Sequence, residues 1–342
     1  MKHLRTLFLC FLALASFACQ RADEPANAVN VFDLLWTKVD QQYTYFDVKQ
    51  VDWDEVYAQY RPKVYDGMSD DSLFRVCAAI LNTLQDGHTN LISPFDVSRP
   101  DSLYYKMIAW SQFDADLVQL NYLTVNAHTT GGIKHNTIRN GEVAYLRYSS
   151  FSNNISSYDL RYLADRYQDC RGMILDLRQN GGGSIDNLWT LLGLFDNHGQ
   201  VLYHTQAKAA PEHDVFTEPR PVYAADSSLL GEKYYSKPVA VLIDRGSFSA
   251  TSFFALATMA YDNIKLFGEY TGGGLGLPNG GALPNGWTYR FSISRTLSKD
   301  GNHPEYENGV PPDQRVLLDP AQTAQGIDNI IETAADWITE QR

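Results

Sequence analysis

The sequence contains few residues of the kinds that build disulfide frameworks or metal sites. Among 342 residues there are four cysteines and eight histidines, with no C-x-x-C pair and no H-x-x-x-H spacing. Zinc sites and redox dithiols depend on such short spacings. Cys77 and Cys170 lie next to apolar runs and are interpreted as small buried hydrophobic residues. We therefore expect no metal ion and no other cofactor.

The sequence is also poor in positive charge. Lysine and arginine total 28 against 40 acidic residues, which gives a formal net charge of -12. A chain with this balance has no broadly basic face, which argues against general nucleic-acid binding. The hydrophobic share of 44% and the charged share of 20% are typical of a soluble globular protein.

The N-terminal apolar run is too short for an ordinary membrane span. Basic residues precede an apolar stretch over 7–15, which ends in Ser16-Phe17-Ala18-Cys19. This order predicts a secretory signal over residues 1–19, followed by a polar tether over 20–27. Cys19 resembles the lipidated cysteine of the bacterial lipoprotein lipobox, although leucine is more usual where Ser16 stands. An ordinary signal with an incidental Cys19 is the alternative. We expect an extracytoplasmic protein of the bacterial cell envelope, on its periplasmic or surface face, with membrane association through a lipidated Cys19 only.

Helical periodicity dominates residues 28–92, and strand patterns dominate residues 93–342. Apolar residues recur at three- and four-residue steps over the first of these ranges, which predicts a small helical N-terminal domain. Apolar runs at 143–148, 173–177, 239–243 and 264–267 predict buried strands. Because helical segments at 185–195 and 250–261 separate some of these strands, residues 93–342 are expected to form an α/β domain with right-handed crossovers.

Ser249 lies at the junction between a predicted strand and a predicted helix, in Asp244-Arg245-Gly246-Ser247-Phe248-Ser249-Ala250. A serine at such a junction can expose its hydroxyl beside the free N–H groups of a helix N-terminus, an arrangement suited to a nucleophile. Serine is also a preferred helix cap, so the junction alone leaves both interpretations open.

Three other segments carry residues suited to chemistry. His88 directly follows the helix end at Gly87 and is either a general base or a polar loop residue. The triple glycine 181–183 follows a buried strand, and its N–H groups could hold an oxyanion; a tight turn is the alternative. Glu305 and Glu307 lie in a late loop, where either could orient a histidine or be a solvated carboxylate.

Together these segments resemble one family, the carboxyl-terminal-processing (tail-specific) serine peptidases, in the branch that includes the tricorn protease core. The motifs that carry the resemblance occur in the family's order and cover nearly the whole chain after the signal: Asp86-Gly87-His88-Thr89, Leu175-Asp176-Leu177-Arg178-Gln179-Asn180-Gly181-Gly182-Gly183, Asp244-Arg245-Gly246-Ser247-Phe248-Ser249-Ala250, Gly268-Glu269-Tyr270-Thr271-Gly272-Gly273-Gly274, and Tyr306-Glu307-Asn308-Gly309-Val310-Pro311-Pro312-Asp313. The resemblance implies a crotonase-like ββα spiral behind the helical domain. It also implies hydrolysis of peptide bonds through an acyl-enzyme.

The resemblance further implies roles for particular residues. Ser249 matches the nucleophile, and the backbone N–H groups of Ala250 and Gly182 match the oxyanion-hole donors. Relatives with a Ser–Lys dyad carry lysine where this chain has Gly274. The tricorn-like arrangement remains, in which His88 is the base.

In that arrangement Glu307 is the remote group that orients His88. Tricorn links its glutamate and histidine through a serine directly before the histidine, a position that is Gly87 here. Thr89 or a water molecule could substitute for that serine, and Glu305 is the alternative to Glu307. The PDZ module usual in the family is not expected, because only about 50 residues separate Thr89 from the strand at 143–148.

The leading hypothesis is therefore a serine-type peptidase that acts on extracytoplasmic peptides or proteins. A non-catalytic ligand-binding protein on the same scaffold is the alternative. An acyl-CoA enzyme of the crotonase fold would leave Ser249 and His88 without a role. The sequence leaves the substrate preference, endo- versus C-terminal cleavage and the oligomeric state open.

Overall fold

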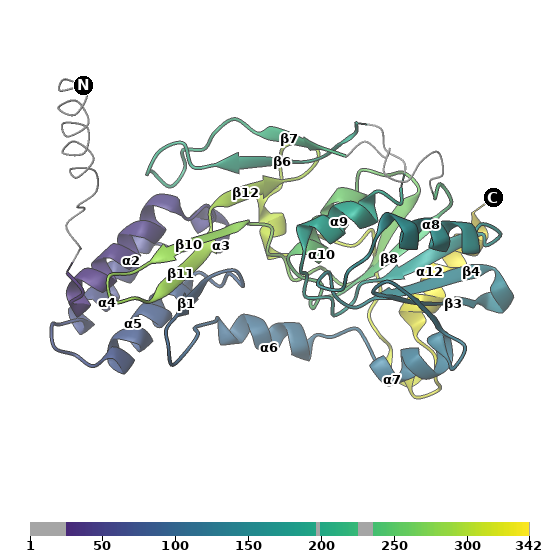
Figure 1. The fold of residues 1–342 in the computed structure, drawn as a ribbon, viewed down its shortest axis with the longest axis horizontal. Helices are drawn as coiled ribbons and strands as arrows, with labels where there is room; N and C mark the ends of the chain where they lie inside the picture. The colour runs from purple at the N-terminus through teal and green to yellow at the C-terminus, as the bar shows by residue number, and fades with distance from the viewer. Residues whose placement is uncertain (1–24, 196–198, 225–234, 342) are drawn as a thin grey trace, which may run out of the picture.

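The computed structural model describes residues 25–195, 199–224 and 235–341 (Figure 1). The predicted signal, with Cys19, and most of the predicted tether lie outside the described residues. No helix within these ranges is long and apolar enough to cross a membrane.

The chain begins with the predicted helical region. Its four α-helices are α2 (Ala28–Gln42), α3 (Phe46–Lys49), α4 (Trp53–Tyr60) and α5 (Asp70–Thr83). Three of them begin at a polar cap, because the side chains of Asn27, Asp52 and Ser69 accept hydrogen bonds from N–H groups of the first turn. The prediction of a helical N-terminal region is confirmed.

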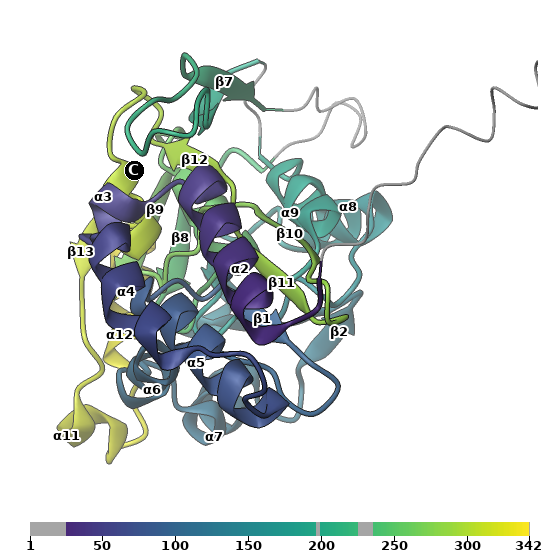
Figure 2. The same cartoon turned by 90° about the vertical axis from the view of Figure 1, so that its left-hand side faces the viewer.

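The helices do not complete a core by themselves. Phe32, Leu35 and Ile80 pack in one buried cluster with Trp287 and Phe291, which come from the far end of the chain. Those two residues belong to or adjoin a small antiparallel sheet of order β1-β11-β10, formed by Asn90–Ile92, Thr288–Ser292 and Pro278–Ala282. Figure 2 shows α2 and α5 lying beside this sheet.

The remaining chain is built around a seven-stranded sheet of order β13-β9-β8-β5-β4-β3-β2. The strands, in that order, are Gln314–Arg315, Ile264–Gly268, Val239–Ile243, Gly172–Asp176, Val143–Tyr148, Ile133–Ile138 and His128–Thr130. Pairing is parallel from β13 to β4 and antiparallel from β4 to β2. The predicted buried strands are present, and the fold is mixed α/β.

Helices cover both faces of this sheet. On one face, alternate strand residues such as Leu175 and Val241 pack against α8 (Ser157–Arg166), α9 (Ile185–Leu192) and α10 (Ala250–Thr258). The opposite face, including Ile174 and Leu242, packs against α7 (Ala115–Val118) and α12 (Asn329–Glu340). Because both faces are buried, the central strands are continuous apolar runs rather than alternating ones.

Shorter elements connect the two parts. A third sheet of order β12-β6-β7 consists of Ser294–Leu297, Val201–Ala207 and Arg220–Tyr223. The helix α6 (Asp101–Ala109) runs along the molecule between the helical region and α7 (Figure 1). The short helix α11 (Pro320–Thr323), labelled in Figure 2, precedes α12.

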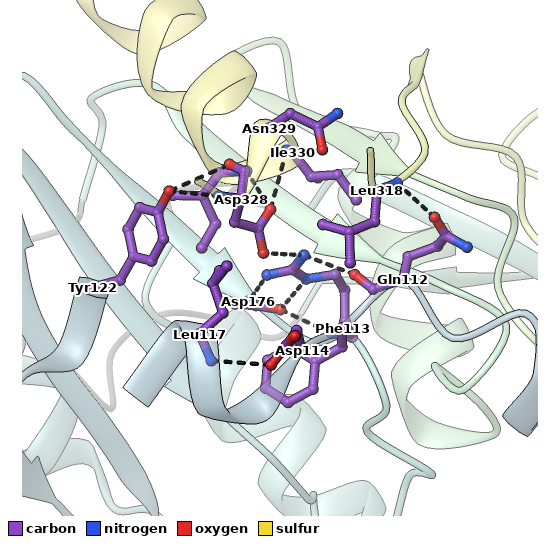
Figure 3. A network of polar contacts seen from close by, with 12 residues as sticks. Gln112, Phe113, Asp114, Leu117, Tyr122, Asp176, Leu318, Asp328, Asn329 and Ile330 are labelled. Atoms are coloured by element: carbon purple, nitrogen blue, oxygen red, sulfur yellow. Dashed lines mark hydrogen bonds and ion pairs between the residues drawn. The ribbon is translucent and has the colours of Figure 1, made fainter. Parts of the chain in front are cut away.

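A buried ionic network lies at the carboxyl end of β5 (Figure 3). Arg178 donates to both carboxylate oxygens of Asp176, at 3.0 and 2.6 Å, and to Asp328 Oδ2 at 2.8 Å. All three side chains are fully buried. Burial alone would raise the pKa of Asp176, but the charge and hydrogen bonds of Arg178 lower it. Asp328 also caps α12, so the network joins the end of β5 to that helix.

Candidate active site

Ser249 stands in a tight turn between β8 and α10. Its backbone is in an unusual conformation for a residue with a side chain, with φ 56° and ψ -120°. Such sparsely populated geometry persists only where the surroundings impose it. The Ser249 N–H donates to Gly273 O at 3.0 Å, and the side chain makes no capping hydrogen bond to α10. The Ser249 hydroxyl therefore does not act as a helix cap, which was one of the two interpretations of this serine.

The hydroxyl of Ser249 instead meets the imidazole of His88. Ser249 Oγ lies 2.9 Å from His88 Nε2, and His88 Nδ1 lies 2.8 Å from the Gly276 carbonyl oxygen. Because a carbonyl oxygen can only accept, Nδ1 carries the proton and Nε2 is left with a lone pair facing the serine. Burial lowers the pKa of His88, against the opposing effects of Asp86 and Gly276, so the ring is neutral near neutral pH.

Two fully buried side chains hold the segment that carries His88. Asp86 Oδ1 accepts the His88 backbone N–H at 2.7 Å, and its Oδ2 accepts the Ser292 hydroxyl at 2.8 Å. Both residues have no exposed surface. Asp86 belongs to the motif around His88, but its positioning role was not predicted. Ser292 carried no signal, because only the fold brings residues 206 positions apart together.

Glu307 does not contact the His88 ring directly but binds the backbone segment that does. It is 1% exposed, and its Oε2 accepts the N–H groups of Leu275 at 2.6 Å and Gly276 at 2.9 Å. The described hydrogen bonds of the His88 ring go to Ser249 and Gly276, so Glu307 reaches the ring only through the backbone at 275–276. The residue that bonds Nδ1 is therefore Gly276, which sequence reasoning did not single out.

The other groups considered for orienting His88 lie elsewhere. Glu305 is exposed and pairs with His303 Nδ1 at 2.8 Å. The Thr89 hydroxyl is buried and has no hydrogen-bond partner among the described residues. Of the two predicted glutamates, only Glu307 adjoins the backbone that holds the base.

Glu307 also meets a lysine from the helical region. Lys49 Nζ lies 3.6 Å from Glu307 Oε1. Burial raises the pKa of Glu307 to about 7, although Lys49 and the two backbone N–H groups oppose that rise. This carboxyl group therefore changes charge near neutral pH.

The ring of Phe248 occupies the space beside Gly87 and Gly274. A Cβ atom on Gly87 would lie 2.7 Å from the Phe248 ring, and one on Gly274 would lie 2.5 Å from it. Neither the tricorn serine nor the dyad lysine could be accommodated without moving this ring. Phe248 also packs on His88, with ring centroids 5.0 Å apart. The Phe248 ring thus fills the space beside both glycines and packs against the imidazole.

The two predicted oxyanion donors lie next to Ser249. Ala250 is the first residue of α10, where N–H groups lack intrahelical partners. A Cβ atom on Gly182 would lie 2.9 Å from Ser249 Cβ and 3.0 Å from Ala250 N, so only glycine permits this close approach. The Gly182 N–H itself donates to Asn180 Oδ1 at 3.0 Å. A role in oxyanion stabilisation requires that N–H group to exchange this partner for a substrate oxygen.

The serines that flank Ser249 have structural contacts. The Ser247 hydroxyl donates to Leu177 O at 2.8 Å, and the Ser252 hydroxyl donates to Ser247 O at 3.1 Å. Both side chains are fully buried. Within the described ranges, no group of three or more His, Cys, Asp or Glu is arranged to hold a metal ion.

Comparison with known proteins places these features in a family. The model of peptidase family S41 matches residues 142–316, and the model of the tricorn protease C1 domain matches residues 25–82. The comparison with family models found no PDZ domain.

One curated relative is named a carboxy-terminal processing protease, and another is named CtpA-like. The carboxy-terminal processing protease CtpA of Bacillus subtilis is 24% identical over 186 residues, which cover 54% of this chain and 37% of that protein. A probable CtpA-like serine protease of Staphylococcus aureus is 22% identical over 192 residues, covering 56% and 36% respectively. The chain thus matches little more than a third of the length of either.

Solved structures extend the similarity to the whole fold. A putative peptidase from Parabacteroides merdae superposes with a TM-score of 0.85 at 34% identity, over 92% of this chain and 97% of that one. The photosystem II D1 C-terminal processing protease gives 0.52 at 14% identity, over 84% and 93%. The tricorn protease gives 0.52 at 12% identity, over 92% and 36%, and these last two similarities show the fold alone.

Proposed function

The chain belongs to peptidase family S41, a family of serine hydrolases, and we propose that it hydrolyses peptide bonds of extracytoplasmic peptides or proteins with Ser249 as nucleophile and His88 as general base. One observation carries the assignment of residues. The His88 Nε2 atom lies 2.9 Å from Ser249 Oγ while its Nδ1 is engaged by Gly276 O. That arrangement presents the correct tautomer of a neutral base to the hydroxyl.

The proposed reaction proceeds through an acyl-enzyme. Ser249 Oγ attacks the scissile carbonyl carbon as its proton passes to His88 Nε2, and the carbonyl oxygen becomes an oxyanion. The N–H of Ala250, joined by that of Gly182, donates to this oxygen; removing one such donor typically lowers the rate by about 100- to 1,000-fold. His88 then gives the proton to the leaving amine, and the C–N bond breaks. Water, activated by the same imidazole, hydrolyses the ester and restores Ser249.

The positioning groups act through the backbone. The carboxylate of Glu307 holds the N–H groups of Leu275 and Gly276. We infer that these two hydrogen bonds keep the Gly276 carbonyl oxygen in place as the acceptor of the His88 Nδ1–H. In that position the carbonyl stabilises the imidazolium that forms during the reaction.

The proposal also includes the fold type of the catalytic region and the cellular location of the protein. The parallel strands β4, β5, β8 and β9, with helices between successive pairs, support a crotonase-like ββα spiral. The N-terminal pattern ending at Cys19 supports a lipid-anchored or secreted protein of the bacterial cell envelope. A mass measurement of the mature N-terminus tests lipidation, since an unmodified cysteine or cleavage elsewhere would contradict it.

Covalent labelling with a fluorophosphonate tests the nucleophile and base. The wild-type chain should be labelled at Ser249, and Ser249→Ala should abolish the label. His88→Ala should slow labelling by about 100-fold or more, because general-base assistance contributes 100- to 10,000-fold. Ser72→Ala and His303→Ala alter exposed residues and are matched controls. Labelling that persists in Ser249→Ala, or that ignores His88→Ala, would refute the assignment.

If the chain were instead a non-catalytic binding protein, the labelling experiment should give the opposite result. A binding protein would take up peptides without turnover and without covalent reaction at Ser249. The hydrogen bond between Ser249 and His88 favours catalysis, because a ligand-binding surface has no need of a nucleophile paired with a neutral imidazole. Mass spectrometry of a peptide pool before and after incubation separates the two.

A further inference from the structure

A cavity of about 350 Å³ adjoins the proposed dyad. Two of its lining residues are the immediate neighbours of the dyad in sequence, since Gly87 precedes His88 and Phe248 precedes Ser249. Leu103, Met107 and Trp110, contributed by α6 and the residue after it, add an apolar wall. Clefts of this size, mostly apolar with a few placed polar groups, are typical of sites for small ligands or single substrate side chains.

Two cations also line the cavity. Lys49 has 7% of its side chain exposed, and its Nζ donates to Asn308 Oδ1 at 2.8 Å. Arg245 uses one nitrogen, Nη1, to hold the carbonyl oxygens of Thr271 at 3.1 Å and Asn308 at 2.9 Å. Both residues line the cavity.

The free side of Arg245 is suited to bind an anion. Within the described part of the chain, its Nε and Nη2 atoms have no recorded hydrogen-bond partner. The nearby carboxylate of Glu269 binds Arg315, with Oε2 2.6 Å from Nη2 of that arginine. A guanidinium with two adjacent free donors matches the two oxygens of a carboxylate.

The charge of the lining is unbalanced. Among the lining residues there are two cations and a single acid, Glu307. Glu307 already accepts two backbone N–H groups, and burial raises its pKa to about 7. Lys49 is paired with Glu307, whereas Arg245 forms no ion pair among the described residues. A partly buried cation without a charged partner is unfavourable, so the cavity beside Arg245 favours an incoming anion.

We propose that this cavity is a substrate subsite that binds a carboxylate through Lys49 and Arg245 while its apolar wall packs on the adjoining carbon atoms of the peptide. The inference rests on the proposed peptidase function and adds the class of substrate, peptides with a carboxylate near the scissile bond. Two sources supply that group, an Asp or Glu side chain and the C-terminal carboxylate of the peptide.

Cleavage of matched peptides tests the subsite. A peptide pool analysed by mass spectrometry supplies a cleaved sequence, which is then made in three forms: internal Glu with a C-terminal amide, internal Gln with a free C-terminus, and internal Gln with an amide. At least one carboxylate form should be cleaved about tenfold or more faster in kcat/KM than the neutral form, as expected for hydrogen bonds to a charged group. The form that is favoured identifies the source.

Variants of the two cations separate the subsite from general damage. Lys49→Met and Arg245→Gln should each lower the ratio of kcat/KM for the carboxylate and neutral forms by about tenfold. Lys299→Met removes an exposed lysine elsewhere and should leave the ratio unchanged. The ratio cancels any loss shared by both peptides, including one that results from the contact between Lys49 and Glu307. An active wild-type enzyme with a ratio of one, or a ratio insensitive to both variants, would overturn the subsite.

Binding to the Ser249→Ala variant distinguishes failure of the subsite from failure of the proposed function. This variant lacks the proposed nucleophile but keeps the cavity, so calorimetry of the same three peptides measures recognition without turnover. Tighter binding of a carboxylate form, lost in Arg245→Gln, would support the subsite even if the wild-type chain cleaved nothing. Equal binding of all three forms would overturn the subsite even in a chain that labels at Ser249.

Discussion

Adding one methyl group at Gly274 should destabilise the protein and impair its base at the same time. The Cβ atom of Gly274→Ala would lie 2.5 Å from two atoms of the Phe248 ring, and the backbone φ of 76° is itself unfavourable for alanine. Gly286 has a similar φ of 85° but nothing within 4 Å of its Cβ position. Gly286→Ala therefore measures the backbone effect alone.

The expected magnitudes follow from these two terms. A left-handed backbone costs about 1–2 kcal/mol for a residue with a Cβ atom, and forcing an atom into a packed site costs about 1–3 kcal/mol more. Gly286→Ala should thus lower the free energy of unfolding by about 1–2 kcal/mol and Gly274→Ala by about 2–5 kcal/mol. In a Phe248→Leu background, the second term should shrink, because a smaller side chain yields the space.

Urea unfolding supplies the free energies, and the rate of fluorophosphonate labelling supplies the catalytic effect. Because Phe248 packs on His88, displacing the ring should slow labelling in Gly274→Ala by about tenfold or more, whereas Gly286→Ala should label normally. Equal destabilisation by the two substitutions would refute the conclusion that Phe248 fills the space beside Gly274.

Three further predictions concern the groups around the site. Glu307→Gln should lower peptidase activity and remove the increase in activity that the wild-type enzyme shows as the pH rises through about 7. Burial raises the pKa of Glu307 to about 7, and only the ionised carboxylate makes charge-assisted hydrogen bonds to the backbone. A variant whose activity still increased near pH 7 would contradict this role; the increase due to His88, at lower pH, should remain. Arg178→Met should lower the free energy of unfolding by about 3–5 kcal/mol in urea titrations, since it leaves two buried carboxylates unpaired; a loss below 1 kcal/mol would be inconsistent with the network. Ser292→Ala should reduce kcat several-fold with little change in KM, because it removes a donor to Asp86; an unchanged kcat would show that this contact is dispensable.

Much of the architecture followed from local patterns. The helices of residues 28–83 form where the apolar periodicity and the capping residues of the sequence predict them. The central strands are the continuous apolar runs expected of a sheet covered on both faces. The helices at 185–192 and 250–258 end earlier than predicted, since apolar residues beyond them continue into turns that pack in the core. The spacing of apolar residues shows which positions are buried but does not separate a helix from a buried turn that follows it. The sequence pattern therefore predicted helices that were too long.

The site was only partly accessible to the same reasoning. Ser249 and His88 stood out because short motifs surround them. The contacts that orient His88 come from Gly276 and Ser292, a backbone carbonyl and an ordinary serine with no motif of their own. Lys49 was missed for a similar reason, since it lies at the end of a short helix far from the other motifs and approaches Glu307 only in the folded chain.

The sequence by itself determined which chemistry is possible. It placed a serine between a strand and a helix, put a glycine where a lysine would offer another base, and left a histidine as the available base. Whether Ser249 caps a helix or faces His88 was decided only by the tertiary structure. A hydrogen bond of 2.9 Å between residues 161 positions apart depends on how the helical region docks against the sheet. Local propensity contains no information on that distance, because it is set by the packing of Phe248 and the backbone at 275–276 around the imidazole.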